Sequence, residues 1–423
     1  LTSVMDDMRP ENKYLHLMDE QEAITKAQAL LNRQGDANVS PLAVYRHAAK
    51  ADSVQQRRPN VVLIMMESMS SKLMKHFGQS ETLTPFLDSL YTRSISFRNF
   101  YSAGIHTNHG LYATLYSFPA MMKRNLMKGS VIPRYSGLPT VLKENGYYNL
   151  FFMTHEGQYD NMNAFFRTNG YDEVFSQENY PADKVVNSFG VQDDFLYDYA
   201  IPVLNQRAAT GEPFFATLLS ISNHPPYVIP PFFHPKTSEP ETQIVEYADW
   251  ALRKFFEEAR KQPWFDNTIF VLEGDHGKLV GDAECELPES YNHIPLMIYS
   301  SRIHPEEKNT FGGQVDIQPT ILGLLNIDYL QNNFGVDLLK EERPCMFYTA
   351  DNMIVGRNDT LLYLYNYETQ QEFTYHIDNG KLKAVPMDDR FLPLKEYSFS
   401  MLQSAEFLVK HGKTVNSVPF TQQ

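Results

Sequence analysis

Cysteine is scarce in this chain, with only Cys285 and Cys345 among 423 residues. Two cysteines that lie so far apart form neither a CxxC motif nor a four-cysteine zinc cluster. A thiolate zinc site and a scaffold held by several disulfides are therefore excluded. The sequence leaves open whether the two thiols pair with each other, and so which redox compartment the chain occupies.

Long apolar runs are also absent. No stretch reaches the roughly 18–20 consecutive apolar residues that a membrane-spanning helix needs, and the first residues do not form a signal peptide. The chain begins with Leu1 and not with Met, so we expect a mature fragment or a trimmed piece. The sequence thus leaves room for a membrane anchor ahead of Leu1.

Positive charge is in deficit, since 37 Lys and Arg face 51 Asp and Glu and give a net charge of −14. No run of Lys or Arg offers a footprint for a phosphate backbone, which argues against nucleic acid as a partner. A P-loop, a GxGxxG turn and a HExxH helix are absent as well. The sequence therefore excludes the nucleotide-binding and zinc-peptidase classes that these motifs define.

The residues that are present indicate a well-packed globular protein, 43% hydrophobic and 13% aromatic. Over residues 58–335, strand-like apolar runs alternate with helical patterns, which predicts a catalytic α/β domain whose mostly parallel central sheet is flanked by helices. Residues 336–423 carry short alternating segments and the hairpin turn Asp378-Asn-Gly380, which predicts a smaller C-terminal antiparallel sheet closed by a helix. Residues 1–57 are predicted to form a polar, helical lead-in.

Individual elements follow from local patterns. A helix is expected to start at Pro85 with Thr84 as its cap, because proline is favoured at the first helical position. Further helices are expected at 137–146, 241–261, 316–326 and 396–410. The expected strands of the central sheet lie at 60–67, 96–102, 148–154, 214–220, 269–273 and 296–299, and those of the C-terminal sheet at 345–349, 353–355, 360–365, 372–377 and 381–385.

Two of the predicted strands end in residues that bind metals. One apolar run delivers Glu67 at its carboxyl end, and a second run about two hundred residues later delivers Asp275 and His276 in the same way. In an open α/β sheet the functional groups collect at the carboxyl ends of parallel strands. Two carboxylates and one imidazole form a plausible divalent-metal site, so we predict these three residues as ligands.

A hydroxyl lies between these strands in the sequence. Residues 102–114 read as the end of a strand, a turn of small residues and then a helix that begins near Thr107. The free backbone N–H groups of a helix N-terminus favour an oxyanion or a phosphate. A threonine hydroxyl is a poor nucleophile at neutral pH, but a divalent metal stabilises its alkoxide. We therefore predict Thr107 as a metal-bound nucleophile.

These motifs together resemble the extracytoplasmic domain of lipoteichoic acid synthase and related phosphoglycerol transferases, sulfatase-like members of the alkaline phosphatase superfamily. The residues that carry the resemblance lie over about 58–330 and are Asn60–Ser68, Thr84-Pro-Phe-Leu-Asp, Gly104-Ile-His-Thr107, Asn223-His224-Pro-Pro-Tyr and Glu273-Gly-Asp-His-Gly277. The resemblance implies the alkaline phosphatase fold, the metal ligands Glu67, Thr107, Asp275 and His276, and the catalytic nucleophile Thr107. It implies Mn²⁺ as the cofactor, with Zn²⁺ or Mg²⁺ as alternatives.

The same resemblance implies a substrate pocket. His224 matches a histidine that contacts the phosphate, and His155 matches a histidine that follows the preceding strand. If three residues are inserted after His155, the family's Asp and Trp-x-Arg positions fall on Asp160, Phe165 and Arg167, with phenylalanine in place of tryptophan. His293 falls where two-metal relatives keep another ligand, so the number of metals stays open.

The resemblance also implies the reaction and the place where it occurs. The expected donor is a phospholipid such as phosphatidylglycerol, and the expected acceptor is a glycan or a polyglycerol phosphate. We expect the chain to lie on the outer face of the cell membrane, in the periplasm or outside the cell, tethered by N-terminal helices that this chain does not contain.

Alternatives remain on the same residues. A true sulfatase needs Cys or Ser in a Cys/Ser-x-Pro-x-Arg motif, which neither cysteine satisfies. A phosphoethanolamine transferase shares the fold and the nucleophile but normally carries several disulfides. A phosphodiesterase of the same superfamily stays open. So does a non-catalytic domain that binds glycerol phosphate, although a pure binder has no reason to keep a metal-activated hydroxyl.

Overall fold

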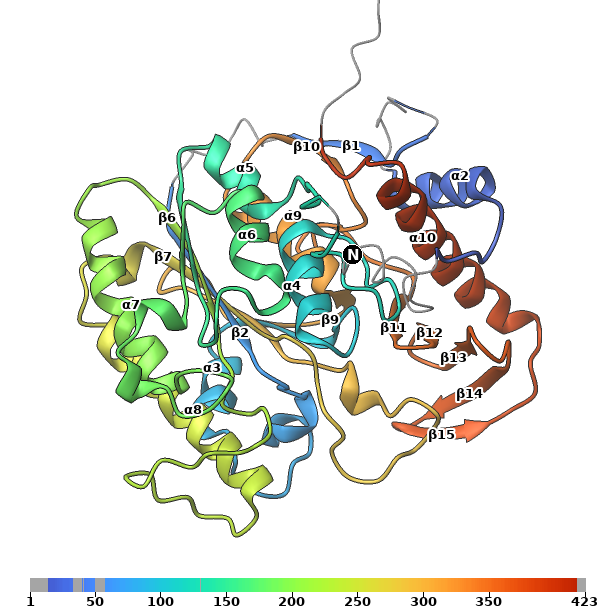
Figure 1. The fold of residues 1–423 in the computed structure, drawn as a ribbon. Helices are drawn as coiled ribbons and strands as arrows, with labels where there is room; N and C mark the ends of the chain where they lie inside the picture. Colours follow the sequence, from blue (N-terminus) through green and yellow to red (C-terminus); the bar gives the residue numbers. More distant parts are fainter. Residues whose placement is uncertain (1–13, 33–39, 41, 50–57, 130, 417–423) are drawn as a thin grey trace, which may run out of the picture.

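The computed structural model of the protein describes residues 14–32, 40, 42–49, 58–129 and 131–416 (Figure 1). Its centre is an eight-stranded sheet with the order β5-β4-β6-β2-β7-β8-β3-β9. Every neighbouring pair is parallel except the two pairs that β8 makes with β7 and β3. The strands are β2 (Asn60–Met66), β3 (Ile95–Tyr101), β4 (Tyr148–Phe152), β5 (Glu173–Phe175), β6 (Phe214–Leu219), β7 (Thr268–Gly274), β8 (Leu296–Tyr299) and β9 (Glu306–Gly313).

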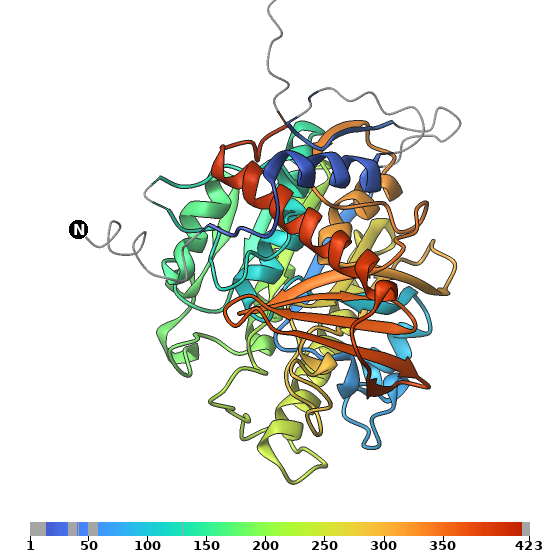
Figure 2. The ribbon, with the colours of Figure 1, turned by 90° about the vertical axis from the view of Figure 1, so that its right-hand side faces the viewer.

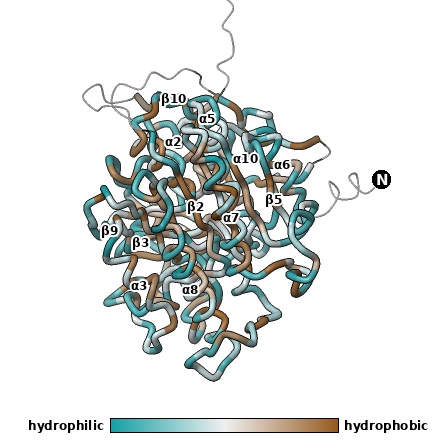
Figure 3. The backbone as a smooth tube through the Cα atoms, turned by 90° about the vertical axis from the view of Figure 1, so that its left-hand side faces the viewer, coloured by the Kyte–Doolittle hydropathy of each residue, from teal (hydrophilic) through white to brown (hydrophobic). Residues whose placement is uncertain are grey.

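The middle strands are apolar along their whole length because both faces of the sheet are covered. All seven residues of β2 are buried. Val61, Leu63 and Met65 pack into one apolar cluster, and Val62, Ile64 and Met66 pack into the other. This alternation is what a strand between two layers of helices requires. In Figure 3 the brown, hydrophobic segments accordingly run through the middle of the molecule around β2.

Helices form a layer on each face of this sheet (Figure 1). The layer that packs with Val62 and Ile64 is α3 (Pro85–Tyr91), α7 (Asp193–Ala208) and α8 (Pro240–Ala259). The opposite layer is α4 (Thr107–Tyr116), α5 (Leu138–Glu144), α6 (Met162–Thr168) and α9 (Ile317–Leu324). The predicted α/β architecture with a mostly parallel sheet is confirmed.

The C-terminal part is a separate antiparallel sheet of five strands in sequence order. The helix α10 (Leu392–Lys410) lies across this sheet, and α2 (Glu20–Leu31) packs beside α10 (Figure 2). The predicted C-terminal sheet and closing helix are confirmed. The strands are β11 (Met346–Ala350), β12 (Met353–Arg357), β13 (Leu361–Asn366), β14 (Glu372–Asp378) and β15 (Lys381–Ala384).

The N-terminal stretch is only partly helical where it is described. After α2, the segment β1 (Tyr45–Ala48) is a strand that pairs antiparallel with β10 (Tyr329–Asn332), so the expectation of a helix here was wrong. Residues 1–13, 33–39 and 50–57 of the expected lead-in lie outside the described residues. The division at residues 57 and 335 stays a prediction, and one apolar cluster includes residues from all three proposed parts.

The start of α3 is capped by a different residue from the one expected. Thr84 occupies the N-cap position of α3, but its side chain makes no cap hydrogen bond. The carboxylate of Asp249 in α8 instead accepts from the N–H groups of Phe86 and Leu87, each at 2.9 Å.

Cys285 and Cys345 are both free thiols. Among the described helices, none has the length and apolar sequence to cross a bilayer.

Candidate active site

The predicted metal ligands meet at the carboxyl ends of two adjacent parallel strands. Glu67 directly follows β2 and Asp275 directly follows β7, and the register of the two strands pairs Met66 with Gly274. The Asp275 N–H donates to the Met66 carbonyl at 3.0 Å, so the pairing continues one residue past the strands. Strand register therefore places the two carboxylates side by side, although about two hundred residues separate them.

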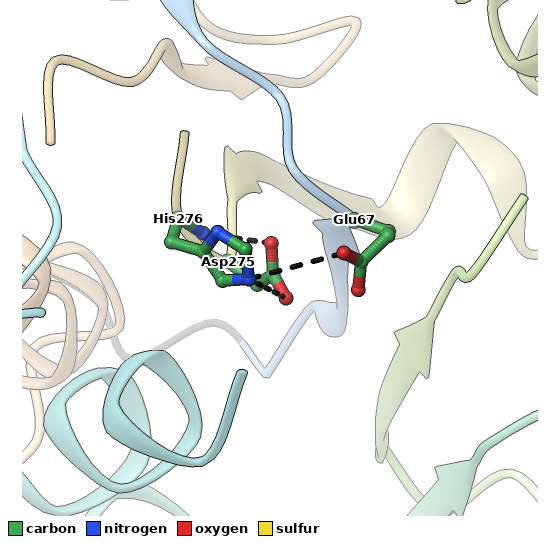
Figure 4. Close-up of side chains that lie close together, drawn as sticks. All are labelled: Glu67, Asp275 and His276. Atoms are coloured by element: carbon green, nitrogen blue, oxygen red, sulfur yellow. Dashed lines mark hydrogen bonds and ion pairs between the residues drawn. The ribbon is translucent and has the colours of Figure 1, made fainter. Parts of the chain in front are cut away.

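His276 completes a compact group (Figure 4). Its Nε2 lies 3.8 Å from Glu67 Oε1 and 3.6 Å from Asp275 Oδ2. Within the described part of the chain, these three residues alone form a set of three or more potential ligands whose ligand atoms all lie within 4.8 Å of one another. Glu67 is 2% exposed and Asp275 is 0% exposed, while His276 is partly open to solvent. The group therefore lies at the floor of the site, and its imidazole faces the opening.

Backbone and hydroxyl groups orient each member of the group. The N–H groups of Ser68 and His276 donate to Asp275 Oδ1, at 2.8 and 2.7 Å. The Ser68 hydroxyl donates to Glu67 Oε1 at 2.6 Å. His276 Nδ1 is 2.8 Å from the Gly277 carbonyl, which fixes the proton on Nδ1 and leaves a lone pair on Nε2 toward the carboxylates.

The charge distribution of this group suits a cation. Asp275 Oδ2 is buried and has no hydrogen-bond partner. Burial, and then the nearby Asp275 carboxylate, raise the pKa of Glu67 well above its ordinary value. Two adjacent buried carboxylates stay ionised together only when a positive charge offsets their repulsion. Glu67, Asp275 and His276 thus fit a divalent ion that takes oxygen and nitrogen donors, such as Mn²⁺, Zn²⁺ or Mg²⁺.

Thr107 lies where the sequence predicted it, as the first residue of α4. Its partly exposed hydroxyl donates to Glu67 Oε2 at 3.5 Å. The helix comes this close to the end of β7 because Gly110 has no side chain, since a Cβ there would overlap the Asp275 carbonyl oxygen. The structure therefore brings the predicted nucleophile to the predicted metal ligands.

Two of the predicted substrate residues lie on loops beside this group. His155 follows β4 and is buried, its ring centroid is 4.7 Å from that of Tyr159, and burial lowers the pKa of His155. His224 follows β6, donates from Nδ1 to the Pro225 carbonyl at 2.6 Å and is partly exposed. The Tyr159 ring lies 6.5 Å from the Phe189 ring, which lies 4.0 Å from the His224 ring, so the two histidines border one region.

Asp160 is a third predicted residue near the nucleophile. Its Oδ2 lies 3.5 Å from the amide nitrogen of Asn108, the residue after Thr107, and its Oδ1 pairs with Lys128 at 2.8 Å. The loop after β4 therefore reaches the N-terminus of α4, and a role of Asp160 in substrate binding stays a prediction.

Three other predicted residues are not brought to the group. Phe165 is 0% exposed and packs edge-on against Tyr116, so its ring belongs to the core and cannot face a ligand. Arg167 is exposed, and its guanidinium donates to Asn163 Oδ1 at 2.9 Å and to the Asp172 carbonyl at 3.2 Å. The arginine therefore fastens α6 to the loop before β5, and the three-residue insertion did not predict its place.

His293 also has a different role from the predicted one. Its Nε2 is 2.8 Å from the Arg98 carbonyl, and its ring stacks on Tyr101 with centroids 5.2 Å apart. Both the nitrogen and the ring face are thus engaged in packing the β7–β8 loop against β3. Within the described residues it is not part of the metal-ligand group.

The sequence leaves Lys278 open between a phosphate contact and a surface charge, and the structure places it near the backbone of Glu67. Lys278 Nζ donates to Asn223 Oδ1 at 2.6 Å and lies 5.2 Å from the centre of the Tyr227 ring. The Asn223 amide donates in turn to the carbonyls of Glu67 and Ser68, at 3.2 and 3.1 Å. Burial lowers the pKa of Lys278 to about 8. In the sequence, a place near the site is indicated for Lys278 because it lies two residues after the predicted ligand His276.

Fold and site together define an α/β enzyme with a metal-type group and a hydroxyl at the carboxyl edge of its sheet. The chain belongs to the sulfatase family, whose sequence model matches residues 59–327. It is similar to lipoteichoic acid synthase 2 of Bacillus subtilis, at 24% identity over 67% of this chain and 47% of that protein. It is also similar to lipoteichoic acid synthase 1 of the same organism, at 25% identity over 77% and 54%. The chain thus spans about half the length of these curated relatives.

Solved structures share the fold. A protein of the alkaline phosphatase superfamily from Vibrio parahaemolyticus matches with a TM-score of 0.83 and 25% identity, covering 95% of this chain and 98% of that one. The lipoteichoic acid synthase LtaP from Listeria monocytogenes matches with a TM-score of 0.73 and 19% identity, covering 92% and 98%. The resemblance drawn from the sequence motifs is therefore confirmed.

Proposed function

We propose that this chain is a metal-dependent phosphoglycerol transferase that cleaves a phospholipid donor through a covalent intermediate on Thr107. One observation carries the proposal: the Thr107 hydroxyl lies 3.5 Å from Glu67, beside a three-residue group that fits a divalent cation. The similarity to lipoteichoic acid synthases supports a phosphoglycerol group as the transferred unit.

In the first proposed step, the Thr107 oxygen attacks the phosphorus of the lipid phosphodiester. The bond from phosphorus to the diacylglycerol oxygen breaks, and the hydroxyl proton of Thr107 can pass to Glu67 Oε2, which already accepts its hydrogen bond. A divalent ion held by Glu67, Asp275 and His276 would favour ionisation of the hydroxyl and offset charge on the phosphoryl oxygens. Lys278 and His224 would meet the remaining negative charge.

The leaving alkoxide needs a proton. Burial lowers the pKa of His155, so its imidazole is neutral at pH 7 and a poor proton donor. His224 is more open to solvent, and its Nε2 is free of the Pro225 contact. We therefore assign the general acid to His224. In the second step an acceptor hydroxyl gives its proton to His224 and attacks the phosphothreonine, and the Thr107 oxygen leaves and regains its proton from Glu67.

The proposal includes partners and a location. The donor would be phosphatidylglycerol or a similar lipid, and the acceptor a glycan or a polyglycerol phosphate chain. A lipid donor places the reaction at a membrane surface, so we propose an extracytoplasmic catalytic domain held to the membrane by segments beyond this chain. Such a tether raises the effective concentration of donor at the site.

The test is incubation with fluorescent phosphatidylglycerol and Mn²⁺, followed by chromatography of the lipid products. We expect labelled diacylglycerol to appear, to disappear after EDTA treatment and to return when Mn²⁺ is added. Full activity in protein shown by elemental analysis to be metal-free would contradict the metal dependence. Release of phosphatidic acid in place of diacylglycerol would contradict the attack on phosphorus with this leaving group.

A further inference from the structure

Uncharged apolar side chains border the site on the side of His155 and His224. We call Tyr159, Val186, Phe189, Pro226 and Val228 the apolar collar. The Phe189 ring lies over the His224 ring with centroids 4.0 Å apart, and the Tyr159 ring lies 6.5 Å from Phe189. Tyr159 is 46% exposed and Val186 is 43% exposed. The collar thus presents apolar surface to solvent beside the two histidines.

The collar has a defined shape because a tight turn holds Phe189 in place. The Val186 N–H donates to the Gly190 carbonyl at 2.9 Å, and the Phe189 N–H donates to Asn187 Oδ1 at 2.8 Å. Gly190 has a φ of +91°, and a Cβ there would overlap the carbonyl oxygen of Thr154, directly before His155. The turn is therefore fixed against the strand end that carries His155.

A small pocket opens between this turn and the loop after β6. Its lining includes Val186, Phe189, His224, Pro226 and Val228 and contains no Asp, Glu, Lys or Arg. The charged groups of the site lie outside this lining: Lys278 is held by Asn223, the Glu67 and Asp275 carboxylates are buried, and Asp160, which follows Tyr159, pairs with Lys128. A phosphodiester bound at Thr107 would therefore have the apolar collar on one side, and Lys278 and the metal-ligand group on the other.

We propose that the apolar collar binds the acyl-bearing glycerol of the donor lipid, the alcohol that leaves the phosphorus. This inference rests on the proposed function and names the residues that select a lipid over a water-soluble diester. Ester-linked acyl chains that leave the phosphate toward His224 would cover Phe189 and Val186 and remove their apolar surface from water. The Phe189–His224 contact would also hold the imidazole near the leaving oxygen.

The test measures binding without turnover. The Thr107→Ala chain is loaded with Mn²⁺ and titrated by calorimetry with dihexanoyl phosphatidylglycerol below its micelle concentration, and separately with glycerophosphoglycerol, which has no acyl chains. We expect the lipid to bind more tightly. Adding Phe189→Ser should weaken lipid binding about 10-fold and weaken binding of the deacylated ligand much less, whereas Phe189→Leu should keep most of the affinity.

Phe232 offers a matched control, because it is another exposed phenylalanine, at 57% exposure, and packs on Trp250 outside the collar. Phe232→Ser should leave both affinities unchanged. Equal binding of the two ligands, no binding of either, or a Phe189→Ser chain that binds lipid as before would overturn the collar. A different result would contradict the proposed function and not the collar. In that result, lipid binding depends on Phe189, but the protein with Thr107 in place releases no diacylglycerol.

Discussion

Lys278 is the residue whose role in the site the sequence left most open. Its ammonium is held by Asn223, which also holds the backbone of Glu67, so the cation is fixed relative to the metal-type group. Arg167, expected to face the phosphate, is instead bound to Asn163 and Asp172. If the proposed function holds, the positive charge that a phosphodiester needs next to two carboxylates would therefore come from Lys278, in the loop after β7.

This arrangement predicts the effect of removing the charge. Lys278→Met should weaken the binding of glycerol phosphate to the Mn²⁺-loaded chain by roughly 10-fold or more, because a hydrogen bond to a charged group is worth about 1.5–3 kcal/mol. Lys278→Arg should recover part of the affinity. Lys261→Met removes an exposed lysine that pairs with Glu258 and serves as the control. Calorimetry with an unchanged dissociation constant for Lys278→Met would refute the role.

The predicted site residues that the structure brings together follow the ends of strands or begin the helix α4. Glu67 and Asp275 could be predicted because parallel register alone brings the ends of β2 and β7 together. Phe165, Arg167 and His293 could not, because their directions depend on how loops and α6 pack. In the sequence, Phe165 beside Phe166 is as consistent with a core helix as with a binding surface. In the structure the Phe165 side chain is buried in the core.

At the scale of elements, the buried strands and the amphipathic helix α8 were predictable from apolar pattern. Two of the elements that the sequence analysis did not predict show why local pattern is not enough. The edge strand β9 (Glu306–Gly313) is mostly polar and forms because it pairs with β3. The helix α7 (Asp193–Ala208) contains Pro202 and lacks a strong apolar stripe. Tertiary pairing and packing, which a local pattern does not contain, decide both elements.

The start of α3 provides a test at this scale. Asp249 is buried and accepts from two N–H groups at the N-terminus of α3, so it does what Thr84 was expected to do. Asp249→Ala should lower the free energy of unfolding by about 1–3 kcal/mol, because both N–H groups lose their partner. Urea unfolding measures this. Glu257→Ala changes an exposed residue of α8, the helix that carries Asp249, and should leave the free energy of unfolding within about 0.5 kcal/mol of the wild-type value. An equally small effect of Asp249→Ala would show that Asp249 does not cap α3.

At the scale of the whole molecule, the C-terminal sheet is fixed to the region around the nucleophile. Asp351, in the turn between β11 and β12, pairs with His106 at 2.8 Å, directly before Thr107. Arg357 of β12 pairs with Glu289 in the β7–β8 loop. The C-terminal part therefore contacts both the residue before Thr107 and the β7–β8 loop.

The Glu289–Arg357 pair predicts a dependence of stability on pH. Burial alone would raise the pKa of Glu289, but the Arg357 guanidinium outweighs it and brings the pKa to about 2. A carboxyl whose pKa is depressed by folding stabilises the protein above its unfolded pKa and loses this contribution as pH falls toward the folded pKa. The window is therefore pH 4.5 to 2, and partial exposure of Glu289 limits the contribution to about 1–3 kcal/mol.

Glu289→Gln isolates this pair from other acid-labile groups. The variant should be less stable than wild type at pH 6 by about 1–3 kcal/mol, and the difference should shrink as the pH is lowered to 3 and below. Urea unfolding of both proteins at each pH gives the comparison. A difference that stays constant across this range would show that the carboxylate charge does not stabilise the contact.

We propose above that Thr107 carries the transferred group, and mass spectrometry of the protein tests this most directly, after incubation with phosphatidylglycerol and Mn²⁺ and an acid quench. We expect the peptide containing Thr107 to gain the mass of one phosphoglycerol group, with diacylglycerol released in equal amount at early times. Thr107→Ala should show neither the adduct nor more than about a thousandth of the turnover, while it still binds Mn²⁺. Diacylglycerol release by Thr107→Ala at the wild-type rate, or an adduct on another residue, would contradict the account.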